Sequence, residues 1–179
     1  PMFLDVDRND AAKFLGMGLE LGGYDYDEFK GDEDEDDDDD SREGPELEEL
    51  TLLLEDRRSL STVREGAERA SSLSGSIARS RDLANTPANH LVPEDLAEEA
   101  REIASEYESV SVTVWDEEDL VNDDMNLILA VGKGSTNPPR LIRLDYEPDS
   151  PDGTVGLAGK GVTFDTGGIS IKPSKNMGE

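Results

Sequence analysis

The stretch of sequence that decides the fold is residues 155–173, which read VGLAGKGVTFDTGGISIKP. It contains five glycines, two lysines (Lys160 and Lys172) and one aspartate (Asp165). The chain has only six lysines among its 17 basic residues, and three of the six fall between positions 160 and 175. Because the other charged residues are mainly Asp, Glu and Arg, these lysines are candidates for a chemical role.

The spacing of the charged residues predicts a bent loop. Lys160 and Asp165 are five residues apart, so a straight strand would point their side chains to opposite faces of a sheet. A bend between or just after them is needed to bring both to one centre. Gly161, Gly167 and Gly168 supply the backbone freedom for such a bend.

These residue types are compatible with a metal site. A lysine amine can ligate a metal only when it is neutral, which requires a pKa lowered by burial or by adjacent cationic charge. The carboxylate of Asp165 is a natural hard ligand beside Lys160. A protonated lysine such as Lys172 can stabilise negative charge that develops on a carbonyl oxygen.

Two other interpretations compete with a metal site. Phosphate binding by a P-loop fails on spacing, because Thr154 stands where a glycine is required and Gly161 follows the lysine where Ser or Thr should hold magnesium. The similar segment 131–134 fails in the same way. A glycine-rich strand end with ordinary surface lysines is left open by composition and spacing alone.

Residues 160–173 resemble, nearly residue for residue, the first metal-binding block of the leucyl aminopeptidase (cytosol aminopeptidase) family. The resemblance covers residues 61–179 well. Upstream it includes, in the family's order, residues 85–89, 93–97, 130–132 and 134–135, with a weaker match at residues 23–30.

The resemblance implies a two-metal aminopeptidase that releases N-terminal amino acids, with a leucine-type preference, from peptide substrates. It implies that Lys160 is a metal ligand, that Asp165 bridges two ions and that Lys172 is the catalytic lysine. The implied cofactors are two divalent ions, Zn²⁺ or Mn²⁺, about 3.5–4 Å apart with a shared water. The implied assembly is a homo-hexamer.

The family pattern also includes residues that this chain does not reach. The family's metal site continues with another aspartate and then an Asn-Thr-Asp-Ala-Glu-Gly-Arg block, which supplies two more carboxylate ligands and a catalytic arginine. The chain begins with Pro1 and ends at Glu179, so both ends look cut, and we expect this fragment alone to be inactive and poorly folded. Two alternatives are a catalytically inactive family member that acts as a binding or scaffold protein, and a nucleotide-binding module.

The chain is strongly acidic, with a formal net charge of −27 and a pI near 4.1. Residues 32–40 are nine consecutive acids, yet without them the charge is still 17 minus 35, or −18. Such a surface repels nucleic acid and anionic membranes, so neither is an expected partner. With few lysines, it predicts a halophilic, haloarchaeal-type protein, whose self-repulsion is screened at molar salt by a Debye length of about 3 Å. An ordinary acidic cytosolic protein is the alternative.

Pattern and resemblance together predict a mixed α/β chain with parts of two domains. The expected segments are the end of an N-terminal domain (residues 1–30, helical spacing from Ala11), a disordered acidic loop (31–45), a strand and connector (46–60), an interdomain helix (61–83) and the first part of the catalytic domain (84–179). Thr62 and Glu65 are predicted to form a capping box for the interdomain helix.

Within residues 84–179, strands alternate with helices, which predicts a three-layer α/β sheet with flanking helices. The expected elements are a helix from Pro93, a strand at 110–114, a short helix or turn at 117–123, a buried strand at 127–131, and strands at 140–146 and 154–159. The loop with Lys160 would then follow the carboxyl end of a strand, where such sheets place ligands.

The remaining candidate residues are expected to have structural rather than catalytic roles. His90, the one histidine, follows a turn, so we expect it to be a local structural or surface residue. Trp115 ends a strand, so we expect it to lie in the core or at an interface. The acidic run lacks the spacing of an EF-hand calcium loop. The chain has no cysteine, no signal-peptide pattern and no apolar run of spanning length, so we expect no disulfides and a cytoplasmic location.

Overall fold

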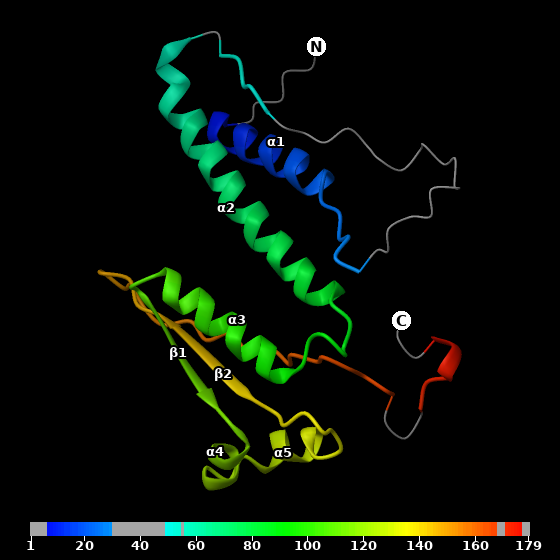
Figure 1. The fold of residues 1–179 in the computed structure, drawn as a ribbon. Helices are drawn as coiled ribbons and strands as arrows, with labels where there is room; N and C mark the ends of the chain where they lie inside the picture. Colours follow the sequence, from blue (N-terminus) through cyan, green and yellow to red (C-terminus); the bar gives the residue numbers. More distant parts are fainter. Residues whose placement is uncertain (1–6, 30–48, 55, 168–170, 177–179) are drawn as a thin grey trace. The chain divides into compact units, whose positions relative to one another are not determined.

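The computed structural model describes residues 7–29, 49–54, 56–167 and 171–176, which fall into two compact units, Pro1–Asn85 and Thr86–Glu179 (Figure 1). The predicted disordered loop, residues 31–45, lies outside the described residues. The elements are α1 (Arg8–Gly22), η1 (Arg57–Ser59), α2 (Leu60–Asn85), α3 (Pro93–Glu106), β1 (Val110–Trp115), α4 (Glu117–Asn122), α5 (Asn126–Gly132), β2 (Leu141–Tyr146) and η2 (Ser174–Asn176).

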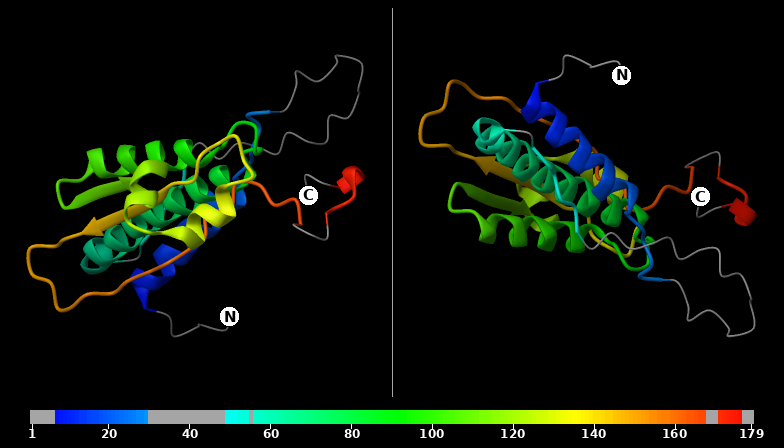
Figure 2. Two further views of the ribbon diagram at one scale, coloured as in Figure 1. Left: turned by 90° about the horizontal axis from the view of Figure 1, so that it is seen from below. Right: turned by 90° about the horizontal axis from the view of Figure 1, so that it is seen from above.

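The first unit is built on close packing of α1 against α2, which lie side by side in all views (Figure 2). Small residues four apart face each other, with Ala12 and Gly16 on α1 and Gly66 and Ala70 on α2, all of them buried. A Cβ added at Gly66 would lie 2.3 Å from the carbonyl oxygen of Asn9, so the helix backbones are nearly in contact. The missing side chains permit this approach.

The helix predicted at residues 61–83 is confirmed by α2, but the predicted capping box is wrong. The helical segment begins earlier, because the Asp56 side chain accepts a hydrogen bond from the Arg58 N–H and caps η1, which runs directly into α2. Thr62 and Glu65 therefore lie inside the helix. The aspartate upstream supplies the acceptor that the first turn requires.

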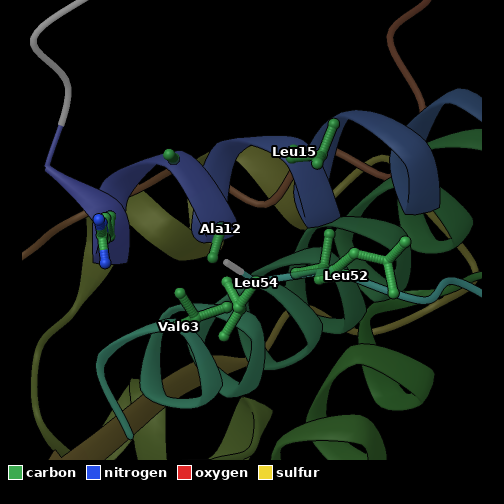
Figure 3. Close-up of a pocket in the computed structure, with 8 residues that line it drawn as sticks. Ala12, Leu15, Leu52, Leu54 and Val63 are labelled. Carbon is green, nitrogen blue, oxygen red and sulfur yellow. The ribbon is translucent and has the colours of Figure 1, made fainter. Parts of the chain in front are cut away.

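The strand predicted within residues 46–60 is wrong where the structure describes it. Residues 49–54 have no regular structure, and residues 46–48 and 55 lie outside the described residues. A strand needs a backbone partner, and the described residues of this unit include no other strand. Instead, residues 52–54 line a pocket of about 300 Å³ together with Ala12, Leu15 and Val63 from the two helices (Figure 3).

The second unit confirms the mixed α/β class. β1 and β2 pair in antiparallel register from Val110 opposite Tyr146 to Trp115 opposite Leu141, and α3 packs against both strands (Figures 1 and 2). The predicted helix from Pro93, the strands at 110–114 and 140–146, and the short helix at 117–123 are all confirmed. The buried apolar residues of this unit are Ala97, Ala100 and Leu120.

Two strands predicted in the second unit are wrong. Residues 127–131 form most of the helix α5, with the Leu127 side chain 86% exposed. Residues 154–159 have no regular structure, and Leu157 is 95% exposed. A short apolar run does not by itself distinguish helix from strand, and β1 and β2 pair only with each other among the described strands. The loop with Lys160 therefore does not follow a strand end in the described structure.

A search of the described residues for a membrane-spanning helix finds none of sufficient length and hydropathy.

The α1–α2 contact yields a prediction with a matched control on the same helix. Gly66→Ala should destabilise the first unit by about 1–3 kcal/mol, because the added methyl group is forced against the backbone of α1. Gly75→Ala should instead stabilise it by about 0.5–1 kcal/mol through helix propensity, since a Cβ there meets nothing within 4 Å. Urea denaturation followed by circular dichroism measures both changes. Equal effects of the two variants would contradict the close approach.

Candidate metal site

The predicted site lies on residues 155–167 and 171–176, which are irregular apart from the single turn η2. Two bends interrupt this segment. The first is at Gly161, where the Val162 N–H donates to the Lys160 carbonyl oxygen at 3.0 Å. The second is at Gly167, which has a φ of 87°. The bends that the glycine pattern predicts at these two positions are therefore present, while Gly168 lies outside the described residues.

Asp165 is held by its own loop. Its Oδ1 accepts a hydrogen bond from the Gly167 N–H at 2.8 Å, which orients the carboxylate, and its side chain is exposed. The positive φ of Gly167 redirects the chain directly after this hydrogen bond. A residue with a Cβ adopts such a backbone only at a cost, so glycine is the residue that fits this turn.

Lys172 is returned to the vicinity of Asp165 by the backbone. The Lys172 N–H donates to the Thr166 carbonyl oxygen at 2.8 Å, which closes the loop between them, and Lys172 is half-buried. Lys160 is exposed and lies before the first bend. No hydrogen bond or ion pair among the described residues joins the side chains of Lys160, Asp165 and Lys172 to one another.

The donor types fit a divalent ion, although the described residues supply too few of them. An amine nitrogen and a carboxylate oxygen are both ligands that zinc accepts, and zinc sites commonly take four ligands. Within the described ranges, no three His, Cys, Asp or Glu side chains are grouped so that they could hold a metal. This stretch thus offers two candidate ligands, Lys160 and Asp165.

Sequence reasoning missed the contacts that support this loop. A Cβ added at Gly161 would lie 3.4 Å from the Leu96 Cδ1, so the Leu96 side chain on α3 lies near the loop beside Lys160. Glu94, on the same turn of α3, accepts hydrogen bonds from Arg101 and Arg140. These two bonds hold the pKa of the Glu94 carboxyl below its usual value, with Arg101 the larger cause. The signal in the sequence that could have indicated the ion pair was Arg140, an arginine that directly precedes a strand in an acidic chain.

Trp115 and His90, the other candidate residues, make contacts within the fold. Trp115 is half-buried, its Nε1–H donates to the Asp123 Oδ2 at 3.0 Å, and the Arg143 guanidinium lies 5.4 Å from its ring centroid. His90 is exposed, and its backbone N–H closes a turn onto the Pro87 carbonyl oxygen. The pocket of the first unit (Figure 3) is lined by none of the predicted site residues.

Comparison with known proteins points to one family. Residues 78–179 match the family model described as the cytosol aminopeptidase family, catalytic domain. A probable cytosol aminopeptidase of Syntrophotalea carbinolica is 42% identical over 170 residues, which cover 94% of this chain and 33% of that protein. A second, from Geotalea uraniireducens, is 41% identical over 179 residues, which cover 97% and 34%. The chain thus spans about a third of the length of these curated relatives.

Two solved structures are similar to this chain in fold. The bottromycin maturation enzyme BotP in complex with Mn has a TM-score of 0.75 and 34% sequence identity, covering 99% of this chain and 34% of that one. A mutant of tomato leucine aminopeptidase has a TM-score of 0.59 over 81% of this chain and 27% of that one, and its 23% identity supports a likeness of fold alone.

The turn at Asp165 can be tested in isolation. Gly167→Ala should raise the amide exchange rates of residues 167 and 172, corrected for sequence, because both amides are hydrogen-bonded in this turn and alanine in this conformation costs about 1–2 kcal/mol. Gly159→Ala is the control, since a Cβ there meets nothing within 4 Å and its φ is not positive. Exchange measured by NMR separates the two. Unchanged protection in Gly167→Ala would show that the turn does not depend on glycine.

Proposed function

The chain belongs to the cytosol aminopeptidase family, and from this premise we propose that the protein that contains it is a metal-dependent aminopeptidase. It would hydrolyse the peptide bond that follows an N-terminal residue. The observation that carries the proposal is the match of residues 78–179 to the family's catalytic domain, which includes the glycine loop with Lys160, Asp165 and Lys172.

Lys160 and Asp165 are the residues of this stretch that would hold metal. Two divalent ions, Zn²⁺ or Mn²⁺, would supply an activated water and polarise the scissile carbonyl. The similar BotP structure is a complex with Mn, which supports the use of a divalent ion here. In this proposal the Lys160 Nζ would be one ligand, and Asp165 presents a carboxylate that the Gly167 N–H already orients.

Lys172 has a different role. As an ammonium group it would donate hydrogen bonds to the substrate carbonyl oxygen and stabilise the negative charge that grows there in the transition state. Its half-buried position and its backbone bond to Thr166 limit its motion relative to Asp165. A donor fixed in advance costs little reorganisation when the reaction occurs.

The finer features of the proposal rest on the resemblance. They are a preference for leucine-type N-terminal residues, a homo-hexameric assembly and a cytoplasmic location. Light scattering on the full-length protein tests the assembly, since a mass below six subunits would contradict it. The proposed halophilic character rests on charge, because the named relatives are bacterial and add no support for a haloarchaeal source.

Replacement of the catalytic lysine gives the direct test. In the full-length protein loaded with Mn²⁺ or Zn²⁺, Lys172→Ala should lower kcat on leucine amide by about 10²- to 10³-fold, the usual effect of removing one oxyanion donor. Lys133→Ala is the control, since Lys133 is an exposed lysine outside the loop. Normal turnover after Lys172→Ala would remove the assigned role, and no hydrolysis by the wild type would favour a scaffold.

Salt dependence tests the adaptation to high ionic strength. Because this chain alone carries a net charge of −27, the Tm of the full-length protein should rise by several degrees between 0.1 and 1 M KCl, over which the Debye length falls from about 10 to about 3 Å. The physical reason is screening of repulsion between surface carboxylates. Differential scanning calorimetry measures the change, and a Tm that stays constant or falls would favour an ordinary acidic protein.

A further inference from the structure

The segment around Lys160 has little support of its own. Residues 155–159 have no regular structure, and the Val155 and Leu157 side chains are 87% and 95% exposed. Cβ atoms added at Gly156 and Gly159 would meet nothing within 4 Å. The described glycines of this segment therefore approach the body of the second unit at one position, Gly161.

Gly161 lies against the first turn of α3. The Leu96 Cδ1 lies close enough that a Cβ added at Gly161 would meet it at 3.4 Å, and Leu96 is half-buried. Gly161 directly follows Lys160 and is the residue at which the chain bends. Leu96 is therefore a side chain of α3 that lies beside the bend after Lys160.

The first turn of α3 is fixed by ion pairs that cross between elements. The Glu94 Oε2 accepts from the Arg140 Nε, and its Oε1 accepts from the Arg101 Nη1 at 3.0 Å. The Arg140 side chain is only 16% exposed, and its Nη1 also donates to the Pro139 carbonyl oxygen at 3.0 Å. Glu94 therefore joins the start of α3 to the residues that lead into β2.

The same turn has a second restraint. The Asp95 Oδ2 accepts a hydrogen bond from the Val92 N–H at 2.7 Å, which fixes the chain as it enters the helix.

Exposed ion pairs contribute little to overall stability. The Glu94 carboxylate is 48% exposed, so its value to the protein is expected to lie in local placement rather than in global stability.

We propose that Glu94 and Leu96 are positioning residues for the metal-binding loop: the Glu94–Arg140 pair fixes the first turn of α3, and Leu96 supports Gly161 and hence Lys160. The inference rests on the proposed function in assigning Lys160 to the metal. Neither residue touches an ion or a substrate. Loss of a group that orients a metal ligand typically weakens metal binding by about 10- to 100-fold.

The test compares variants of the full-length protein by hydrogen–deuterium exchange of the Val162 N–H, which bonds the Lys160 carbonyl oxygen, read in the peptide that covers residues 156–164, without added metal. Leu96→Ala should speed exchange there strongly, and Glu94→Gln should speed it by a smaller factor. Leu96→Met should restore slow exchange, because it conserves side-chain volume. Glu98→Gln is the matched control, since Glu98 also bonds Arg101 from α3 but, among the described residues, bonds neither Arg140 nor the loop. It should leave exchange unchanged.

Metal affinity gives the second measurement. Competition with a chelator should show Zn²⁺ binding weakened by about 10- to 100-fold in Leu96→Ala, with the wild-type value in Glu98→Gln. Wild-type exchange in the 156–164 peptide of either Leu96→Ala or Glu94→Gln would overturn the inference, as would an equal increase in Glu98→Gln. If Leu96→Ala does not fold, Glu94→Gln decides, because its side chain is about half exposed.

Failure of the proposed function gives a different result. A wild-type protein that binds no Zn²⁺ or Mn²⁺ and hydrolyses no leucine amide would overturn the proposed function and the metal-related half of this inference. The exchange data report separately on whether α3 supports the loop. The two failures are therefore distinguishable in the same set of variants.

Discussion

The candidate metal site depends on a backbone constraint at Gly167. The Gly167 N–H donates to the Asp165 carboxylate, and the φ of 87° at Gly167 redirects the chain beyond this bond, after which the Lys172 N–H donates to the Thr166 carbonyl oxygen. Only glycine adopts this conformation at little cost. A carboxylate oriented by its own loop needs no partner from another domain to be ready for a cation.

The rest of the second unit supplies a base for this loop. β1 and β2 form a small antiparallel sheet, α3 packs on it, and the first turn of α3 meets the loop at Gly161. The first unit is held together differently, by two helices whose small residues allow their backbones to come nearly into contact.

Much of the fold could be predicted from the sequence because long or strongly patterned segments carry clear signals. The helix α2 follows from repeated small and apolar residues over more than 20 positions, and β1 follows from alternating valines. The errors fall on short apolar runs, residues 52–54, 127–131 and 154–159, where composition favours burial and only a pairing partner makes a strand. The pairing partner is a property of the whole fold, so no local pattern could reveal it.

The candidate site shows the same division. Its residues could be chosen from sequence, since lysines are rare in this chain and the resemblance to the family names their roles. The positions of Leu96 and Arg140 beside their partners could not be predicted from the sequence. Leu96 is 65 residues from Gly161, and Arg140 is 46 residues from Glu94. A contact at that separation depends on how α3 and β2 pack, which single-sequence patterns do not encode.

The most direct test of metal binding by this loop is anomalous diffraction at the zinc edge from crystals of the full-length protein loaded with Zn²⁺. We predict the Lys160 Nζ and an Asp165 carboxylate oxygen at about 2.0–2.2 Å from bound ions. Ions that are held entirely by other residues, with Lys160 and Asp165 outside coordination distance, would contradict it.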